Sequence, residues 1–231
     1  MPPPTPTPVM SWDDYVAAWS GLHGGFDPRR ASPPVRGWVL LAYRLGSLLG
    51  RNRIQPLTVT LAGLLLCLAV PVVIGLAGPA GLAVGALLVL LAAVADGLDG
   101  AVAVVTGRVT RAGHVYDSVA DRLGEAAWLT AFWLAGAPAW LAVAAGAGSW
   151  LHEYLRARAT TAGMTEIGTV TVGERPTRVA VGVTGLLLAP IATLVGPEWT
   201  APALTVTVAI WLLLQTVGLC QLVVAVHRAL R

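Results

Sequence analysis

Long apolar stretches, separated by short polar or glycine- and proline-rich breaks, make up most of this chain. Each stretch is close to the length of about 20 residues that a helix needs to cross the hydrocarbon core of a bilayer. The pattern therefore predicts an all-α integral membrane fold with six transmembrane helices, at residues 56–77, 80–106, 112–135, 138–160, 175–196 and 200–226.

A two-faced helix is predicted immediately before the first span, at residues 35–53. Its arginines fall on one side when successive residues are placed about 100° apart, and its large apolar residues gather on the other. This pattern is typical of an interfacial helix on an anionic membrane surface, the alternative being a solvated helix packed on a neighbour. The arginines are Arg36, Arg44 and Arg51, and the apolar residues are Trp38, Leu41, Leu45, Leu48 and Leu49.

The first 34 residues are rich in proline, threonine and glycine and carry no signal-peptide pattern. We expect residues 1–34 to be a disordered or irregular cytoplasmic segment, with a short helix around Trp12–Trp19. Residues 54–231 then form one six-helix catalytic domain.

Composition excludes a soluble globular domain of this size. Of the 231 residues 56% are apolar, and the mean hydropathy is +0.72. The two cysteines, Cys67 and Cys220, lie inside apolar runs, which indicates neither a disulfide framework nor a zinc site. We expect no nucleic-acid partner.

Arginines occur before the first predicted span, between the second and third, between the fourth and fifth, and after the sixth, whereas the other three turns carry none. By the positive-inside rule both termini face the cytoplasm, and we expect the plasma membrane as the location. The arginines that set this topology are Arg29, Arg30, Arg36, Arg44, Arg51, Arg53, Arg108, Arg111, Arg156, Arg158, Arg175, Arg178, Arg228 and Arg231.

Four aspartates interrupt the second and third predicted spans, where a charge costs about 2.5–3.5 kcal/mol at the bilayer centre. Asp96 and Asp99 lie three residues apart and Asp117 and Asp121 four apart, so each pair projects from one helix face. Two such helices side by side would direct four carboxylates into one pocket, which suits Mg²⁺ or Mn²⁺. The alternative is an acidic, water-filled ion path.

These residues resemble the signature of the CDP-alcohol phosphotransferases, D-x-x-D-G-x-x-A-R-x8-G-x3-D-x3-D. Seven of its eight fixed positions match, and Val104 replaces the expected arginine. A P-N-x-x-T motif at the start of the first span is matched in part, because Leu57 replaces its asparagine. The matching residues are Asp96, Asp99, Gly100, Ala103, Gly113, Asp117 and Asp121, with Pro56 and Thr60 in the second motif.

The resemblance implies a homodimer of six-span subunits that transfers a phosphatidyl group from CDP-diacylglycerol to an alcohol and releases CMP. It implies that Asp96, Asp99, Asp117 and Asp121 hold Mg²⁺ or Mn²⁺, with Asp121 also the general base. The donor-binding residues that it implies are Gly100, Ala103, Gly113, Pro56 and Thr60.

Val104 removes a cation that the family places near the nucleotide. Three interpretations stay open: Arg108 or Arg111 takes over the role, donor affinity is lower, or the donor differs. A family member that binds lipid or nucleotide without turnover, and a transporter with an acidic path, are the alternative functions.

Four arginines border the predicted cytoplasmic loop between the fourth and fifth spans: Arg156, Arg158, Arg175 and Arg178. Guanidinium groups bind phosphate with a planar fork. These stretches resemble the subgroup with a phosphorylated acceptor, such as the actinobacterial phosphatidylinositol phosphate synthases. Inositol phosphate is therefore the favoured acceptor and glycerol phosphate the next. The alternative is that these arginines only set the topology.

Glu125 continues the face of Asp117 and Asp121 one turn further along the helix. We interpret it either as a partner of Arg122 or as a carboxylate paired elsewhere inside the helix bundle.

Overall fold

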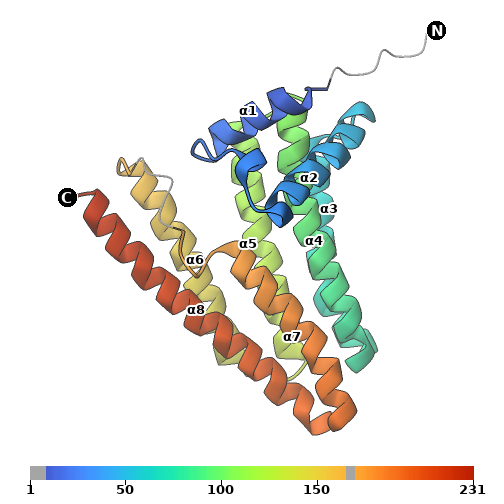
Figure 1. Ribbon diagram of the computed structural model, residues 1–231. Helices are drawn as coiled ribbons and strands as arrows, with labels where there is room; N and C mark the ends of the chain where they lie inside the picture. The colour runs from blue at the N-terminus through green and yellow to red at the C-terminus, as the bar shows by residue number, and fades with distance from the viewer. Residues whose placement is uncertain (1–8, 165–169) are drawn as a thin grey trace. The chain divides into compact units, whose positions relative to one another are not determined.

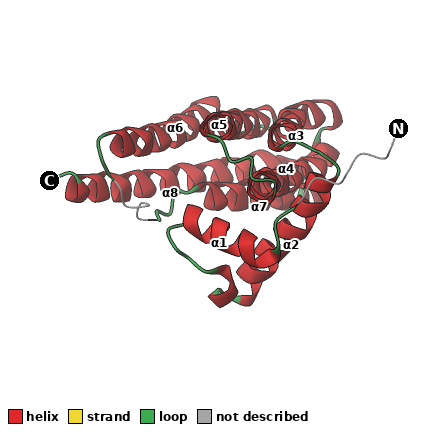
Figure 2. Cartoon of the chain, turned by 90° about the horizontal axis from the view of Figure 1, so that it is seen from above, coloured by secondary structure: helices red, strands yellow, loops and turns green. Residues whose placement is uncertain are grey.

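The structure is a computed structural model that describes residues 9–164 and 170–231, and every regular element in that part of the chain is a helix (Figures 1 and 2). Residues 1–8 of the predicted disordered segment lie outside the described residues. The helices are α1 (Trp12–Leu22), η1 (Pro28–Arg30), α2 (Pro33–Arg51), α3 (Pro56–Ala77), α4 (Pro79–Val105), α5 (Arg111–Leu134), α6 (Ala139–Thr161), α7 (Arg175–Val195), η2 (Pro197–Trp199) and α8 (Thr200–Ala229).

Proline and glycine mark the ends of these helices. Proline is the first residue of α3 and of α4, where its missing N–H would have no helical partner in any case. Gly107 has a φ of 66° just after α4, a left-handed conformation that glycine adopts without steric cost. These breaks fix where the aspartate-bearing helices α4 and α5 end and begin.

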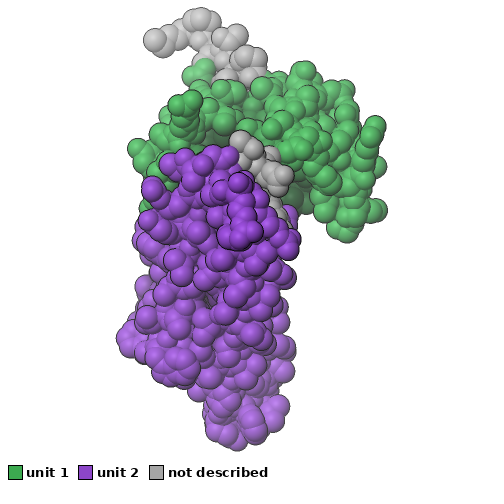
Figure 3. All heavy atoms as spheres, turned by 90° about the vertical axis from the view of Figure 1, so that its left-hand side faces the viewer, with its two compact units in different colours: residues 1–64, 92–121 green, residues 65–91, 122–231 purple. Residues whose placement is uncertain are grey.

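The chain divides into two compact units, coloured separately in Figure 3. Unit 1 comprises residues 1–64 and 92–121, and unit 2 comprises residues 65–91 and 122–231. The division falls inside α3, α4 and α5, so each of these helices contributes to both units. Unit 1 contains all four aspartates of the predicted site.

An apolar core in unit 1 joins α1 to α2 and α4. Tyr15 and Val16 of α1 are each 1% exposed and pack with Val39 of α2 and with Val104 and Val105 of α4. The helix expected around Trp12–Trp19 is thus present, extends to Leu22 and is built into the core.

Two hydrogen bonds fix the segment that precedes α1. The backbone N–H of Met10 donates to the carbonyl oxygen of Val105 at 3.2 Å. The hydroxyl of Tyr43 in α2 donates to the carbonyl oxygen of Met10 at 3.0 Å. The N-terminal segment from residue 9 onward is therefore attached to both α2 and α4.

Helix α8 lies beside α6 and α7 in unit 2. A Cβ added at Gly185 of α7 would lie 2.2 Å from Thr207 of α8, so only glycine permits this close approach of the two helices. Trp128 of α5 and Trp211 of α8 meet edge to face in the core, each 1% exposed.

Four helical segments of the described chain are long and apolar enough to cross a membrane: Pro56–Ala77, Ala80–Val105, Arg175–Val195 and Pro197–Ala229. Helices α5 and α6 occupy the positions of the third and fourth predicted spans but carry more charged residues. The count of six spans stays a prediction. So does the interfacial position of α2, whose Trp38, Leu41 and Leu48 are exposed apolar residues.

Candidate metal and nucleotide site

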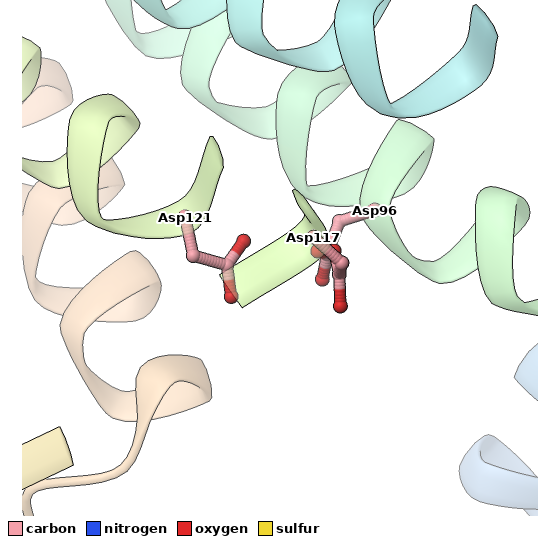
Figure 4. Close-up of side chains that lie close together, drawn as sticks. All are labelled: Asp96, Asp117 and Asp121. Atoms are coloured by element: carbon pink, nitrogen blue, oxygen red, sulfur yellow. The ribbon is translucent and has the colours of Figure 1, made fainter. Parts of the chain in front are cut away.

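Three carboxylates from two helices meet in unit 1 (Figure 4). Asp96 comes from α4, and Asp117 and Asp121 come from successive turns of α5. Each offers one oxygen atom, and these three atoms lie within 4.8 Å of one another. All three residues are half-buried. The spacing along the sequence predicted that four carboxylates would converge, and three of them meet here.

Asp99 stands apart from the three clustered carboxylates, one turn along α4 from Asp96. Only 6% of its surface is exposed, and its Oδ2 accepts a hydrogen bond of 2.5 Å from the hydroxyl of Thr60 in α3. The same hydroxyl lies 3.2 Å from the carbonyl oxygen of Pro56. This bond joins the two sequence motifs, while direct metal binding by Asp99 stays a prediction.

The donor set of the cluster fits a hard divalent cation. Carboxylate oxygens are the ligands that Mg²⁺ and Mn²⁺ prefer, and like charges at this separation repel one another unless a cation or protons intervene. Half-burial strengthens both the repulsion and the attraction to a cation. The geometry of Asp96, Asp117 and Asp121 is therefore that of a candidate metal centre.

A cavity of about 840 Å³ in unit 1 opens beside these aspartates. Its volume lies within the range of about 300–1,000 Å³ that is typical of small-molecule sites. It contains nearly all the residues predicted to bind the donor or the metal. These are Pro56, Thr60, Asp96, Asp99, Gly100, Ala103, Arg108, Gly113 and Asp117. Asp121 and Arg111 are not among its described lining residues.

The two predicted glycines have different surroundings. A Cβ built on Gly100 would have no described atom within 4 Å, so the backbone there borders open cavity space. The N–H of Gly113 donates to the hydroxyl of Thr110 at 3.0 Å, and a Cβ on Gly113 would lie at the same distance from that oxygen. A ligand can thus approach the backbone closely at Gly100.

Val104 is 5% exposed and belongs to the apolar core that α1 forms with α2 and α4. Its location explains why an apolar side chain fits where the motif has arginine. Of the two arginines proposed to replace that cation, Arg108 lines the cavity. Their roles in donor binding stay predictions.

Four aromatic or imidazole side chains that line the cavity and precede α3 were not predicted from the sequence to do so. They come from α1, from the residue that follows it, and from α2. The signal was the concentration of aromatic residues in a short helix that ends at Gly24-Gly25. The four residues are Tyr15, Trp19, His23 and Trp38.

A buried ionic network occupies unit 2. Arg178 of α7 is 2% exposed, and its Nε donates to Glu125 Oε1 at 2.8 Å. Its Nη2 donates to Glu153 at 3.1 Å. Glu125 also accepts from Arg122 at 3.1 Å, so it is both a partner of Arg122 and paired inside the helix bundle.

The other arginines predicted to bind the acceptor phosphate also lie in unit 2. Arg156 of α6 donates to Glu174, which precedes α7. Arg158 is exposed near the end of α6, and Arg175 is the first residue of α7. As placed here, Arg156 and Arg178 already bind carboxylates. Phosphate binding by any of the four stays a prediction.

The geometry of the aspartate site agrees with a comparison against protein families. The family model described as CDP-alcohol phosphatidyltransferase matches residues 53–226, well over half of the chain. The chain belongs to this family. As a CDP-alcohol phosphatidyltransferase it is a transferase of phospholipid biosynthesis with membrane helices. Members of this family transfer a phosphatidyl group from a CDP-linked donor to an alcohol.

Two curated relatives of this CDP-alcohol phosphatidyltransferase are archaetidylinositol phosphate synthases. The Pyrococcus horikoshii protein is 36% identical over 145 residues, which cover 60% of this chain and 72% of that protein. The Aeropyrum pernix protein is 35% identical over 101 residues, which cover 42% of this chain and 52% of that protein. The match thus spans only about half the length of the latter.

Solved structures of Mycobacterium tuberculosis phosphatidylinositol phosphate synthase share the fold. The structure with CDP-DAG bound has a TM-score of 0.64 and 25% identity, covering 80% of this chain and 92% of that one. The complex with manganese and citrate has the same score and identity and covers 80% and 88%.

Proposed function

We propose that this transferase moves a phosphatidyl group from CDP-diacylglycerol to a hydroxyl of a phosphorylated polar alcohol and releases CMP. Inositol phosphate is the favoured acceptor and glycerol phosphate the next. The observation that carries the proposal is the meeting of Asp96, Asp117 and Asp121 beside a cavity that both donor motifs line. The relatives named for phosphatidylinositol and archaetidylinositol phosphate synthesis support the choice of acceptor.

Asp96, Asp117 and Asp121 would hold Mg²⁺ or Mn²⁺, with Asp99 as the fourth carboxylate of the motif. The manganese in a related structure supports this assignment. When bound, the metal neutralises charge on the donor phosphates and on the departing CMP. The Thr60–Asp99 hydrogen bond keeps α3 and α4 in register beneath the donor.

Other residues of the site would act on the acceptor hydroxyl and on the phosphates of the donor. Asp121 accepts the proton of the attacking hydroxyl, since a carboxylate beside the reacting group acts as a general base. Gly100 leaves room for the donor to approach the backbone, and Arg108 on the cavity wall attracts its phosphates. Arg175, Arg178, Arg156 and Arg158 are the candidate acceptor-phosphate residues.

The predicted membrane arrangement suits this reaction. A site that opens to the cytoplasm from a lipid-embedded bundle receives a donor with acyl chains and a water-soluble acceptor. We propose a multi-pass plasma-membrane protein with six spans, both termini in the cytoplasm and a homodimeric assembly.

The test is a transfer assay on purified protein in lipid. CDP-diacylglycerol is supplied with Mg²⁺ or Mn²⁺ and, in turn, inositol phosphate, glycerol phosphate, inositol or serine, and CMP release is measured. We expect CMP release with inositol phosphate and none in EDTA. Asp121→Asn should lower the rate by about 10²–10⁴-fold, the usual contribution of a general base. Glu198→Gln, an exposed carboxylate of η2, is the matched control.

Two outcomes would overturn parts of the proposal. Full activity of a folded Asp121→Asn variant would remove that residue as the base. If the folded wild-type protein binds CDP-diacylglycerol but releases no CMP with any acceptor, it is a non-catalytic binder. If it does not bind CDP-diacylglycerol, it uses a different donor.

A further inference from the structure

The N-terminal segment provides one wall of the cavity, although it lies outside the residues that the family model matches. The match covers residues 53–226, whereas α1 ends at Leu22. Tyr15 and Val16 anchor α1 in the core, and Trp19 of α1 and His23, the residue after α1, line the cavity. This chain therefore builds part of its binding site from residues that the family motif does not contain.

Trp19 and His23 form a flat stacked pair. They are four residues apart, so the indole of Trp19 in α1 and the imidazole of His23, which caps the end of α1, lie one turn apart on the same side. Their ring centroids are 3.8 Å apart, and the angle between the ring planes is 13°. Gly24 and Gly25, with φ of 66° and 81°, end the helix directly after His23.

The hydrogen bond of His23 fixes which ring nitrogen carries the proton in the neutral side chain. Nδ1 lies 2.8 Å from the carbonyl oxygen of Trp19. A carbonyl oxygen only accepts hydrogen bonds, so Nδ1 carries the hydrogen and donates it. In the neutral imidazole Nε2 is then an acceptor, and no described residue bonds it.

We propose that Trp19 and His23 bind the pyrimidine base of the CDP-linked donor. The base stacks on the indole of Trp19 at the edge of the imidazole, and His23 Nε2, whose lone pair lies in the imidazole plane, accepts a hydrogen bond from the exocyclic amino group of cytosine. Uracil has a carbonyl oxygen at that position, which would face an acceptor. The pair therefore selects cytosine over uracil. This inference rests on the proposed function, because it assigns a part of the same donor.

The distribution of chemistry within the cavity supports this orientation. The carboxylates of Asp96 and Asp117 lie where a metal would hold the diphosphate, and the pair of Trp19 and His23 comes from a different segment of the chain. Val104, beneath that wall, removes the charged contact that the motif provides. Stacking on aromatic side chains and a neutral acceptor replace it.

The test measures binding of CMP and UMP to the full-length protein in detergent with Mn²⁺, by calorimetry. Base stacking on an aromatic side chain contributes about 1–3 kcal/mol, so Trp19→Ala should weaken CMP binding by about 5- to 150-fold. Trp19→Phe keeps a ring and should stay within about threefold of wild type. His23→Ala should lower the ratio of CMP to UMP affinity at least about fivefold.

Controls separate this inference from the function on which it rests. Trp140→Ala removes an exposed tryptophan of unit 2 and should leave CMP binding unchanged. Thermal unfolding midpoints and CMP release show whether each variant is folded. If wild type neither binds CMP nor releases it, the proposed function fails.

If wild type binds CMP and turns over while Trp19→Ala and His23→Ala match it, only the base assignment fails. Weaker binding of CDP-diacylglycerol by Trp19→Ala with unchanged CMP binding would also overturn the assignment, because it would place the acyl chains against α1.

Discussion

Thr60 in the first turns of α3 and Asp99 near the C-terminal end of α4 are joined by a hydrogen bond of 2.5 Å. It connects the partly matched motif of the first span to the aspartate motif of the second. Asp99 is 6% exposed, so the hydroxyl satisfies a carboxylate that has little access to water.

Removing that hydroxyl should destabilise the protein. Thr60→Val keeps the shape of the side chain but leaves the buried carboxylate without this donor. Hydrogen bonds to charged groups contribute about 1.5–3 kcal/mol, and we expect a loss of that size in the free energy of unfolding. Unfolding in detergent measures it, with Thr60→Ser as the control that keeps the hydroxyl. Equal stability of Thr60→Val and wild type would show that the bond contributes nothing.

The buried pair of Arg178 and Glu125 should behave as a coupled unit. Removing one partner leaves a buried charge uncompensated, which costs about 3–5 kcal/mol. Arg178→Ala and Glu125→Ala should each lower the unfolding free energy by this amount, and the double variant should lose much less than their sum. Arg158→Ala, at an exposed site, should change stability by less than about 0.5 kcal/mol.

Acceptor kinetics distinguish a structural role of Arg178 from phosphate binding. If Arg178 has only a structural role, Arg178→Ala lowers the free energy of unfolding, and the variant protein that remains folded has the wild-type KM for inositol phosphate. A raised KM for inositol phosphate, measured at a temperature at which the Arg178→Ala variant is shown to be folded, would support its assignment to the acceptor phosphate.

Restoring the arginine of the motif at position 104 should not restore a nucleotide contact. Val104 is 5% exposed and belongs to the same apolar core as Tyr15 and Val16, although it also borders the cavity. Val104→Arg therefore brings a cation against that core and should cost several kcal/mol. Val104→Met adds volume without charge and should cost about 1–3 kcal/mol. Tighter CMP binding by a Val104→Arg protein as stable as wild type would contradict this explanation.

Tyr15 should make stability fall at alkaline pH. Burial raises the pKa of Tyr15 to about 12, whereas an unfolded tyrosine titrates near pH 10. Between pH 10 and 12 the phenol of Tyr15 loses its proton in the unfolded state but keeps it in the folded state. The contribution of the neutral, buried phenol to the free energy of unfolding is therefore complete below pH 10 and is lost as the pH rises through 12. The loss is about 2–3 kcal/mol.

Chemical unfolding at pH 8 to 11, compared between wild type and Tyr15→Phe, checks this effect. The variant should lose less stability over that range, because all other titrating groups are shared. Parallel curves for the two proteins would show that the phenol of Tyr15 is not responsible.

The core of the site could be predicted from the sequence because helix geometry is local. Spacings of three and four residues put each aspartate pair on one face, and the cost of charge in an apolar helix required the pairs to share a partner. Asp96, Asp117 and Asp121 meet as expected. The helix positions followed equally well from apolar runs bounded by proline and glycine.

Contacts between distant segments were not available from such patterns. The sequence around Arg178 does not predict that it pairs with Glu125 and Glu153, because these ion pairs depend on how α5, α6 and α7 pack. In the same way the sequence predicted a short helix around Trp12–Trp19 but not that its apolar side completes a core with Val104.

The position of Val104 beneath α1 links two stretches that are far apart in the chain. Val104 borders both the core that contains Tyr15 and Val16 and the cavity. An arginine at the corresponding position would have to leave that core and extend into the cavity, so a relative with arginine there would pack a helix like α1 less well. Across the family, the presence of a helix like α1 and an apolar residue at this position should therefore covary. Genome sequences alone can reveal whether these two features are inherited together. If they are, a helix like α1 combined with an apolar residue at this position would mark a distinct evolutionary branch of the family.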